Sequence, residues 1–182
     1  MSSRPLPWNG KNVYFLGFMA VGKSRIGSAF AKKIGRPFFD TDSLIVERAG
    51  KEIAQIFAES GEEEFRRLET EVIRDVAARQ NLVIALGGGA VLREENWRLI
   101  ERSGITICLT APIEVLVERI GRNQKRPLLA NLTPEERRTK IAEMLAARQP
   151  FYQRAQFTFE SSNSMPVSRI VSTIYDHLLV NL

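Results

Sequence analysis

The sequence predicts an α/β fold in which a mostly parallel, open sheet is flanked by helices. Apolar runs typical of strands alternate with helical patterns along the whole chain, and several of these runs are apolar throughout. Strands that are covered by helices on both faces have no polar side, which explains continuous apolar runs. No linker or change of composition divides residues 1–182, so we expect a single domain with a sizeable core.

The first expected strand is the apolar run 13–16, which leads through a glycine-rich turn into a helix at 23–34. Ile26, Phe30 and Ile34 recur at helical spacing, and Gly35 ends the pattern. Further apolar runs predict strands at 37–39, 82–86, 105–109 and 157–159. Further periodic patterns predict helices at 62–78, 94–102, 112–120, 134–148 and 166–179.

The helix expected at 134–148 has the clearest start. Thr133 can cap it, Pro134 suits its first position, and Glu136 completes a capping box. The segment before it, about 121–133, is rich in Arg, Gly, Asn and Pro. This segment is either a mobile lid over phosphate groups or an ordinary surface loop.

Composition and charge narrow the class of protein. There are 26 Lys and Arg against 21 Asp and Glu, which gives a net charge of +5 and suits an anionic ligand. The basic residues are scattered among acids and no nucleic-acid motif is present, so we expect no nucleic-acid partner. Cys108 is the single cysteine, which excludes an intrachain disulfide and indicates a reducing compartment.

The sequence also indicates where in the cell the protein is located. No run approaches the roughly 18 apolar residues that a membrane span needs. Residues 1–10 contain Pro5, Pro7 and Asn9 without an apolar stretch, and we expect a short frayed leader there. We therefore expect a cytoplasmic protein without a membrane partner.

The segment Gly17 to Ser24 reads Gly, four residues, Gly-Lys-Ser, and stands between an expected strand and an expected helix. Backbone N–H groups in such a turn point at an anion, and the helix N-terminus adds partial positive charge. Lys23 would then reach the β and γ phosphates of a nucleotide, and Ser24 would offer its hydroxyl to Mg²⁺. The alternative is a chance match in a loop.

Asp40 and Asp42 follow the second expected strand, where ligands gather in open α/β sheets. One carboxylate could hold water on Mg²⁺ while the other accepts a proton or hydrogen bond from a substrate hydroxyl. Alternatively, Asp42 or Ser43 caps a helix that runs toward Ala49.

The stretch 62–69 is a charged helix segment that contains Arg66. Glu62 with Arg66, and Glu63 with Arg67, stand four residues apart, so a solvated face of ion pairs explains the pattern without a ligand. Arg66 has a functional role only if another feature draws it inward.

Three glycines, Gly87, Gly88 and Gly89, follow the strand expected at 82–86. They permit either unusual backbone dihedrals or a close approach of the backbone to a ligand. Arg126 and Arg148 each precede a turn that a proline fixes, and each is either a ligand contact or an ordinary surface or helix-end charge. His177 is the single histidine and has no partner pattern, which argues against a catalytic triad.

Taken in order, these motifs resemble the shikimate kinase family, which are small P-loop kinases related to nucleoside monophosphate kinases. The resemblance covers nearly the whole chain, and the ordered set is far more specific than any one motif. Its members are the segments 17–24, 39–42, 56–57, 61–69, 86–90, 126–129 and 148–152.

The resemblance implies a three-layer P-loop kinase fold with a five-stranded parallel sheet flanked by helices, a substrate-binding region at about 42–80 and a lid at about 121–133. It also implies transfer of the γ-phosphoryl group of ATP, with Mg²⁺, to the 3-hydroxyl of shikimate, and we expect a monomer. It implies catalytic roles for Lys23, Asp42 and Arg126; ATP contacts for Gly17, Ala20, Val21, Gly22, Lys23, Ser24, Arg25, Arg119 and Arg126; shikimate contacts for Asp42, Arg66, Gly87, Gly88, Gly89 and Arg148; and Mg²⁺ contacts for Ser24 and Asp40.

Two positions of the loop depart from the family pattern. Ala20 replaces a glycine that is often found there, and Arg25 stands where threonine is common after the serine. We expect nucleotide binding to survive, with the turn depending on Gly17 and Gly22 and not on a glycine at position 20. No arginine around 163–166 matches one that contacts nucleotide in some members.

Two alternatives remain beside this interpretation. Another small-molecule kinase of the same architecture, such as a gluconate or nucleotide kinase, would share most of these motifs. A nucleotide-binding regulatory protein without chemistry would share the fold, but the complete set of Lys23, Asp42 and Arg126 argues against it.

Overall fold

Five parallel strands form one sheet in the computed structural model, which describes residues 6–121 and 132–182. The order across the sheet is β2-β3-β1-β4-β5, so the connections from β1 and β4 leave in opposite directions. Ligands bind at the carboxyl ends of the strands beside such a switch point. The strands are β1 (Asn12–Gly17), β2 (Phe38–Asp40), β3 (Val83–Ala85), β4 (Gly104–Thr110) and β5 (Phe157–Glu160).

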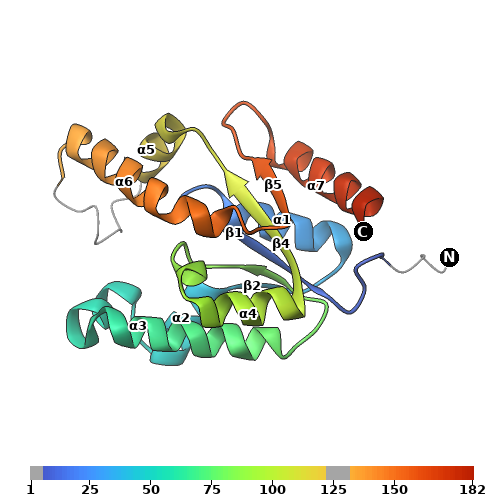
Figure 1. The fold of residues 1–182 in the computed structure, drawn as a ribbon, viewed down its shortest axis with the longest axis horizontal. Coiled ribbons are helices and arrows are strands. Elements are labelled where there is room, and N and C mark those ends of the chain that lie inside the picture. Colours follow the sequence, from blue (N-terminus) through green and yellow to red (C-terminus); the bar gives the residue numbers. More distant parts are fainter. Residues whose placement is uncertain (1–5, 122–131) are drawn as a thin grey trace.

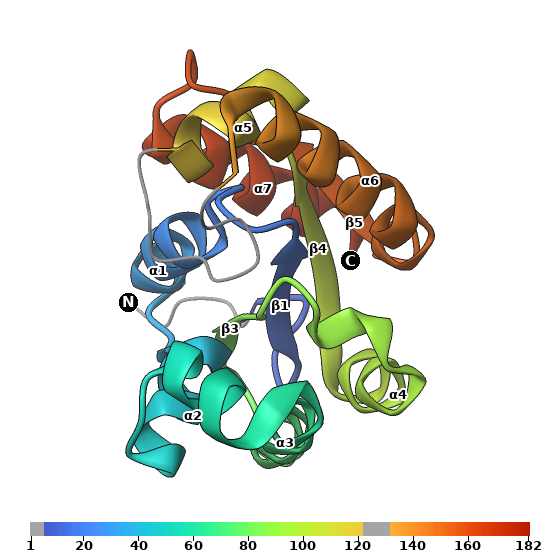
Figure 2. The same ribbon diagram turned by 90° about the vertical axis from the view of Figure 1, so that its left-hand side faces the viewer.

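Helices cover both faces of the sheet, which confirms the expected three-layer arrangement (Figure 1). Figure 2 shows α1 and α4 on opposite sides of the strands, and α2 with α3 on the other side of the β1–α1 turn from α5 and α6. The helices are α1 (Lys23–Ile34), α2 (Thr41–Ala49), α3 (Ile53–Ala77), the short 3₁₀ helix η1 (Ala90–Leu92), α4 (Glu94–Ser103), α5 (Ile113–Gly121), α6 (Pro134–Tyr152) and α7 (Val167–Asn181).

Glycines set both ends of α1, which has the boundaries predicted from the sequence. Gly22 precedes the helix with φ of 108°, and Gly35 follows it with φ of 66°. The N–H of Gly35 bonds the carbonyls of Ala31 and Lys32, which satisfies the last turn.

Residues 41–61 contain more helix than predicted. α3 begins at Ile53 instead of residue 62, and Glu52 with Gln55 forms a capping box at its start. Gly61 has φ of 81° and ψ of 177°, so the chain kinks there and the helix resumes in a new direction. Because of the kink, the apolar residues before and after Gly61 do not follow one continuous helical pattern, so the periodicity predicted only the helix after Gly61.

The helix α6 has the predicted cap but a later end. Thr133 accepts a hydrogen bond from the N–H of Glu136, and Pro134 occupies the first turn. The helix runs to Tyr152 and not to residue 148, although Pro150 lies within it. The N–H of Gln153 still bonds the carbonyl of Gln149 at 3.0 Å, so the turn around the proline stays closed.

The expected frayed leader is wrong for residues 6–10. The indole of Trp8 is only 1% exposed and meets the ring of Tyr175 in α7 edge to face, with 6.2 Å between centroids. The burial of so large an apolar ring stabilises the segment against the domain. The N–H of Gly10 also bonds the side chain of Asn81 at 2.8 Å.

A fully buried amide, that of Asn12, joins β1 to the end of α3 and the start of β3. Its Nδ2 donates to the carbonyls of Val76 and Arg79 at 3.2 and 2.9 Å, and to the hydroxyl of Tyr14 at 3.2 Å. Its Oδ1 accepts from the N–H of Leu82 at 2.9 Å. The amide is therefore satisfied in the core, where an unpaired polar group would be costly.

The strand β4, which lies between β1 and β5, contains the single cysteine. Cys108 is 2% exposed, and burial raises the pKa of its thiol to about 11. Among the described residues, no helix combines the length and the apolar character that a membrane crossing requires.

Candidate active site

The loop between β1 and α1 has the geometry of a phosphate site. Gly17 has φ of 131°, and a Cβ on it would lie 2.3 Å from the carbonyl oxygen of Leu109 in the neighbouring strand. Gly22 then turns the chain into α1, and the first turn of that helix contains no acidic residue. The helix N-terminus therefore presents its N–H groups and partial positive charge at the carboxyl end of β1.

Ala20 is the one residue of this loop, other than glycine, with a positive φ. Its φ is 60°, in the left-handed region, where glycine is unstrained and other residues cost roughly 1–2 kcal/mol. A glycine would therefore be less strained at position 20, but the turn forms with alanine there, between Gly17 and Gly22, as expected.

Two cations hold the carbonyls of the loop. The ammonium of Lys23 donates to the carbonyls of Gly17 and Phe18, both at 2.9 Å. The guanidinium of Arg119 donates to the carbonyls of Ala20 and Val21 at 3.4 and 3.2 Å. Both contacts favour a loop whose N–H groups remain available to an anion.

Arg119 also joins this loop to the segment after β5. Its guanidinium donates to Oδ1 of Asn163 at 2.9 Å and to the carbonyl of Ser161 at 3.3 Å. Partial burial lowers the pKa of Arg119, and the charge of Arg25 acts in the same direction. Arg25 is exposed, so this side of the loop is open and basic.

Ser24 and Asp40 meet where α1 and β2 approach each other. The hydroxyl of Ser24 donates to Oδ2 of Asp40, whose Oδ1 accepts from the N–H of Asp42 at 3.0 Å. Asp40 therefore caps α2, in place of Asp42 or Ser43. A hydroxyl and a carboxylate beside a phosphate loop suit Mg²⁺, which takes few protein ligands and completes its shell with phosphates and water.

A cavity lies between the phosphate loop and the region formed by α2 and α3. Its polar lining residues are Asp42, Arg66, Glu69 and Arg148, and its apolar lining residues are Met19, Ile53, Phe57 and Phe65. Gly87, Gly88 and Gly89 complete its lining. The structure thus brings the six residues expected at the acceptor site, namely Asp42, Arg66, Gly87, Gly88, Gly89 and Arg148, to one cavity.

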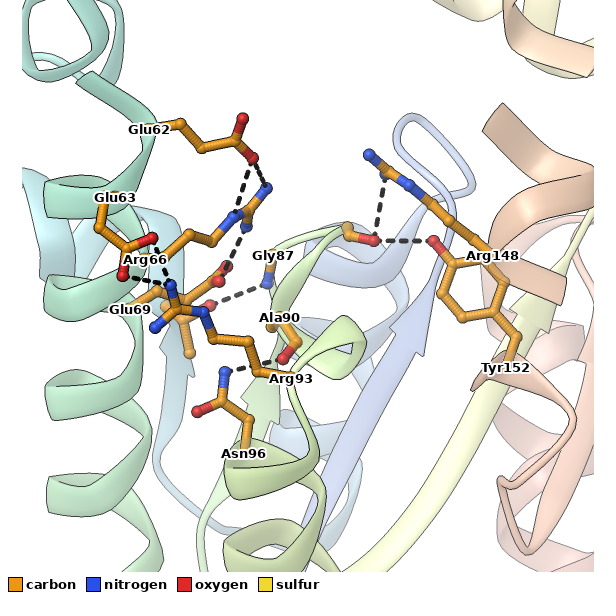
Figure 3. A network of polar contacts seen from close by, with 12 residues as sticks. Glu62, Glu63, Arg66, Glu69, Gly87, Ala90, Arg93, Asn96, Arg148 and Tyr152 are labelled. Atoms are coloured by element: carbon orange, nitrogen blue, oxygen red, sulfur yellow. Dashed lines mark hydrogen bonds and ion pairs between the residues drawn. The ribbon is translucent and has the colours of Figure 1, made fainter. Parts of the chain in front are cut away.

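Arg66 is drawn inward, although one of the alternative ion pairs does form. Its Nη2 lies 3.1 Å from Glu62, and its Nη1 lies 2.8 Å from Glu69, whose side chain is 1% exposed (Figure 3). Burial lowers the pKa of Arg66, but the two carboxylates outweigh it and leave the pKa raised. The guanidinium is therefore a fixed, fully charged group at the cavity.

The second ion pair expected on this helix is absent. Arg67 pairs with Glu64 and Glu71, while Glu63 points to Arg93, which donates to its two oxygens at 2.7 and 2.8 Å. Arg93 follows η1, so this contact joins α3 to the turn that contains the three glycines (Figure 3).

Glu69 is a lining residue that the sequence interpretation did not single out. Burial raises the pKa of Glu69, Arg66 opposes this effect, and the charge of Asp42 adds to it. Its Oε2 holds Arg66, while its Oε1 is buried without a hydrogen-bond partner among the described residues. Its spacing of three residues after Arg66 places it on the same helix face, which is the signal that could have identified it.

Each of the three glycines makes room for a neighbouring group. A Cβ on Gly87 would lie 2.7 Å from Asp42 and 2.9 Å from Glu69, and a Cβ on Gly89 would lie 2.7 Å from Arg66. None of the three has a positive φ, so close approach and not unusual dihedrals explains them. At Gly87 and Gly89 the groups that approach closely are side chains of the cavity.

Gly88 lies where the phosphate loop meets the cavity. A Cβ on it would be 3.4 Å from the N of Met19 and 3.8 Å from the O of Gly17. Its carbonyl accepts from Arg148 at 3.3 Å and from the hydroxyl of Tyr152 at 2.7 Å (Figure 3). Arg148 is therefore turned toward the cavity and is more than a helix-end charge. Arg126 and residues 122–131 of the expected lid lie outside the described residues.

Comparisons with known proteins agree with this geometry. A model of the shikimate kinase family matches residues 19–179. The chain is 40% identical over 156 residues to a shikimate kinase of Thermodesulfovibrio yellowstonii, a match that covers 86% of this chain and 88% of that relative.

Solved structures give the same result. Shikimate kinase from Bacteroides thetaiotaomicron has a TM-score of 0.87 and 34% identity, covering 94% of this chain and 99% of that chain. Shikimate kinase from Acinetobacter baumannii, solved in complex with shikimate, has a TM-score of 0.87 and 34% identity and covers 94% of both chains. The chain therefore belongs to the shikimate kinase family.

Proposed function

We propose that this protein transfers the γ-phosphoryl group of ATP to the 3-hydroxyl of shikimate, giving shikimate 3-phosphate and ADP. The proposal rests mainly on one observation: the guanidinium groups of Arg66 and Arg148 line the same cavity, which adjoins the phosphate loop. Arg66 approaches Gly89 and Arg148 contacts Gly88, on adjacent residues of one turn. Two planar forks so placed suit a carboxylate, which shikimate carries.

The acceptor would bind between these arginines and the apolar wall. Ile53, Phe57 and Phe65 form an apolar part of the lining, where the ring centroids of Phe57 and Phe65 lie 4.8 Å apart and the guanidinium of Arg66 lies over the Phe65 ring. A six-membered carbon ring can pack against such a wall, while its hydroxyls face the carboxylate of Asp42 and the turn at Gly88. Asp42 would orient the attacking hydroxyl and accept its proton.

The donor would lie in the β1–α1 loop. The backbone from Gly17 to Ser24 and the N-terminus of α1 would hold the phosphates, and the side chain of Lys23 would move from the loop carbonyls to the β and γ phosphates. Arg119 would lie beside the base, next to the exposed Arg25. Arg126, outside the described residues, remains the expected second cation at the phosphates.

Ser24 and Asp40 would hold Mg²⁺ through a hydroxyl and a carboxylate. When bound, the ion neutralises phosphate charge. The main task of the protein is to align the γ-phosphoryl group with the acceptor hydroxyl, because phosphoryl transfer has a loose transition state and needs no covalent intermediate. The lid expected at 121–133 would exclude water from the phosphates.

A gluconate kinase is the nearest alternative, because gluconate also carries a carboxylate. Gluconate has a hydroxyl on every carbon along its chain and offers little apolar surface to Ile53, Phe57 and Phe65. The apolar wall therefore favours a ring such as that of shikimate over an open-chain polyol.

A coupled assay of ADP release tests the proposal. With ATP and Mg²⁺ present, we expect turnover that depends on shikimate and is absent with gluconate or a nucleoside monophosphate. An enzyme that is folded, binds ATP and gives no shikimate-dependent release of ADP would overturn the proposed function.

A further inference from the structure

One carbonyl oxygen at the cavity accepts two side-chain hydrogen bonds. The phenol of Tyr152 donates to the carbonyl of Gly88 at 2.7 Å, and Nη1 of Arg148 donates to the same oxygen at 3.3 Å. Tyr152 is 6% exposed and stands at the end of α6, so its ring is fixed by packing (Figure 3). Because a carbonyl has two lone pairs, these donors use its full capacity.

The shorter bond fixes the direction of a peptide unit in a segment that has no side chains of its own. Gly87, Gly88 and Gly89 have far more backbone freedom than other residues. The phenol restrains this freedom from outside the turn. In a trans peptide the N–H points opposite to the carbonyl, so holding the oxygen of Gly88 toward α6 directs the N–H of Gly89 away from α6.

The donor so directed belongs to the cavity lining, as does the N–H of Gly88. Within residues 6–121 and 132–182, the N–H groups of Gly88 and Gly89 have no hydrogen-bond acceptor. Both residues line the cavity, and Gly89 is buried. A buried N–H group normally has a partner, so the N–H of the buried Gly89, beside that of the half-buried Gly88, indicates an oxygen-rich ligand at this cavity.

We propose that Tyr152 is a positioning residue for the phosphoryl acceptor: its hydroxyl holds the Gly88–Gly89 peptide, and thereby keeps the N–H of Gly89 and the guanidinium of Arg148 directed at the acceptor. This inference rests on the proposed function, since it deepens the description of the same site. In this view Arg148 makes only a longer hydrogen bond to the Gly88 oxygen because the phenol of Tyr152 already makes the shorter one. Without the phenol, Arg148 would close on Gly88 and leave the acceptor carboxylate.

The hydroxyl acts as a neutral donor throughout the working pH range. Burial raises the pKa of Tyr152 to about 12, and the charge of Arg148 opposes this rise. The phenol therefore keeps its proton, and the positioning effect has no pH dependence near neutrality. Removal of the hydroxyl should change the acceptor KM without changing the shape of the pH–rate profile.

Tyr152→Phe is the direct test, because it keeps the buried ring and removes one donor. Tyr175→Phe is the matched control, since that hydroxyl lies on α7, where its ring packs on Trp8. We expect Tyr152→Phe to raise the KM for shikimate about three- to tenfold, as the loss of one well-made hydrogen bond implies, with the KM for ATP within about twofold of wild type. Tyr175→Phe should leave both constants unchanged.

Two readouts separate this inference from the proposed function. If wild type turns over shikimate and Tyr152→Phe has wild-type constants, or if both KM values rise together with a lower Tm, the positioning role fails alone. If wild type does not use shikimate, the proposed function fails, and the NMR amide resonance of Gly89 in the free protein still tests the positioning role. We expect this resonance to shift or broaden in Tyr152→Phe and not in Tyr175→Phe; an unchanged resonance in Tyr152→Phe would overturn the inference.

Discussion

Replacement of Ala20 by glycine tests whether the phosphate loop holds backbone strain. Ala20 has φ of 60°, and an alanine in this region costs roughly 1–2 kcal/mol relative to an unstrained residue. The change loses a half-buried methyl, worth about 0.4 kcal/mol, and adds freedom to the unfolded chain, worth about 0.4–1 kcal/mol. The balance leaves a gain of about 0.5 kcal/mol, or about 1–2 °C in Tm.

Asn81 supplies the matched comparison, because its φ is 59°. Asparagine tolerates this conformation better than alanine, and its side chain accepts from the N–H of Gly10 at 2.8 Å. Asn81→Gly should therefore lose about 1–2 kcal/mol through the missing hydrogen bond and the added chain freedom. Thermal melts of both variants should differ by about 4–8 °C, with Ala20→Gly the more stable. An Ala20→Gly variant that melts below wild type would refute the strain argument.

Four further predictions follow from the site and the core. Asp42→Asn should lower kcat by about 10²–10⁴ while the ATP affinity, measured by calorimetry, stays within about twofold; equal losses in both would make Asp42 structural. Arg66→Lys should raise the KM for shikimate about tenfold, because an ammonium cannot form the planar fork, and an unchanged KM would return Arg66 to the role of a surface ion pair. Asn12→Ala should destabilise the fold by about 2–4 kcal/mol in urea, against almost no change for the exposed Asn181→Ala, since it leaves backbone groups buried and unpaired. Burial raises the pKa of Glu69 above its ordinary value of 4.5, so the folded state binds this proton more readily than the unfolded chain, and the residue's contribution to stability is complete below that pH and falls as pH rises. Urea unfolding between pH 4 and 7 should show that wild type loses more stability over this interval than Glu69→Gln, and parallel curves would contradict the shift.

The parts of the fold that could be predicted are those with local signals. The strands stood out because parallel strands under helices are apolar throughout, and α1 was placed to the residue because Gly22 and Gly35 mark its ends. The first part of α3, before Gly61, was not predicted because the kink at Gly61 interrupts the helical periodicity. The burial of Trp8 was not predicted, because a proline-rich segment gives no sign that its aromatic ring packs into the core.

The site residues also fall into those that the sequence could predict and those that it could not. Asp42 and Arg66 could be named from motifs because their spacing from a strand end or within a helix is visible in the chain. Glu69 and Tyr152 could not, since their roles depend on what each meets in space: a guanidinium one turn away and a carbonyl 64 residues away in sequence. Motif reading detects residues that approach a ligand better than residues that hold those residues in place.

The burial of Cys108 has a practical consequence for following this enzyme in solution. With a pKa of about 11 the thiol is about one part in ten thousand thiolate at neutral pH, although it lines a pocket between β4 and α6. The natural protein should therefore react only slowly with maleimide dyes near neutral pH. A cysteine introduced at Glu63, whose side chain is 87% exposed on α3, would be the one reactive thiol and could report on motion of the acceptor region during turnover.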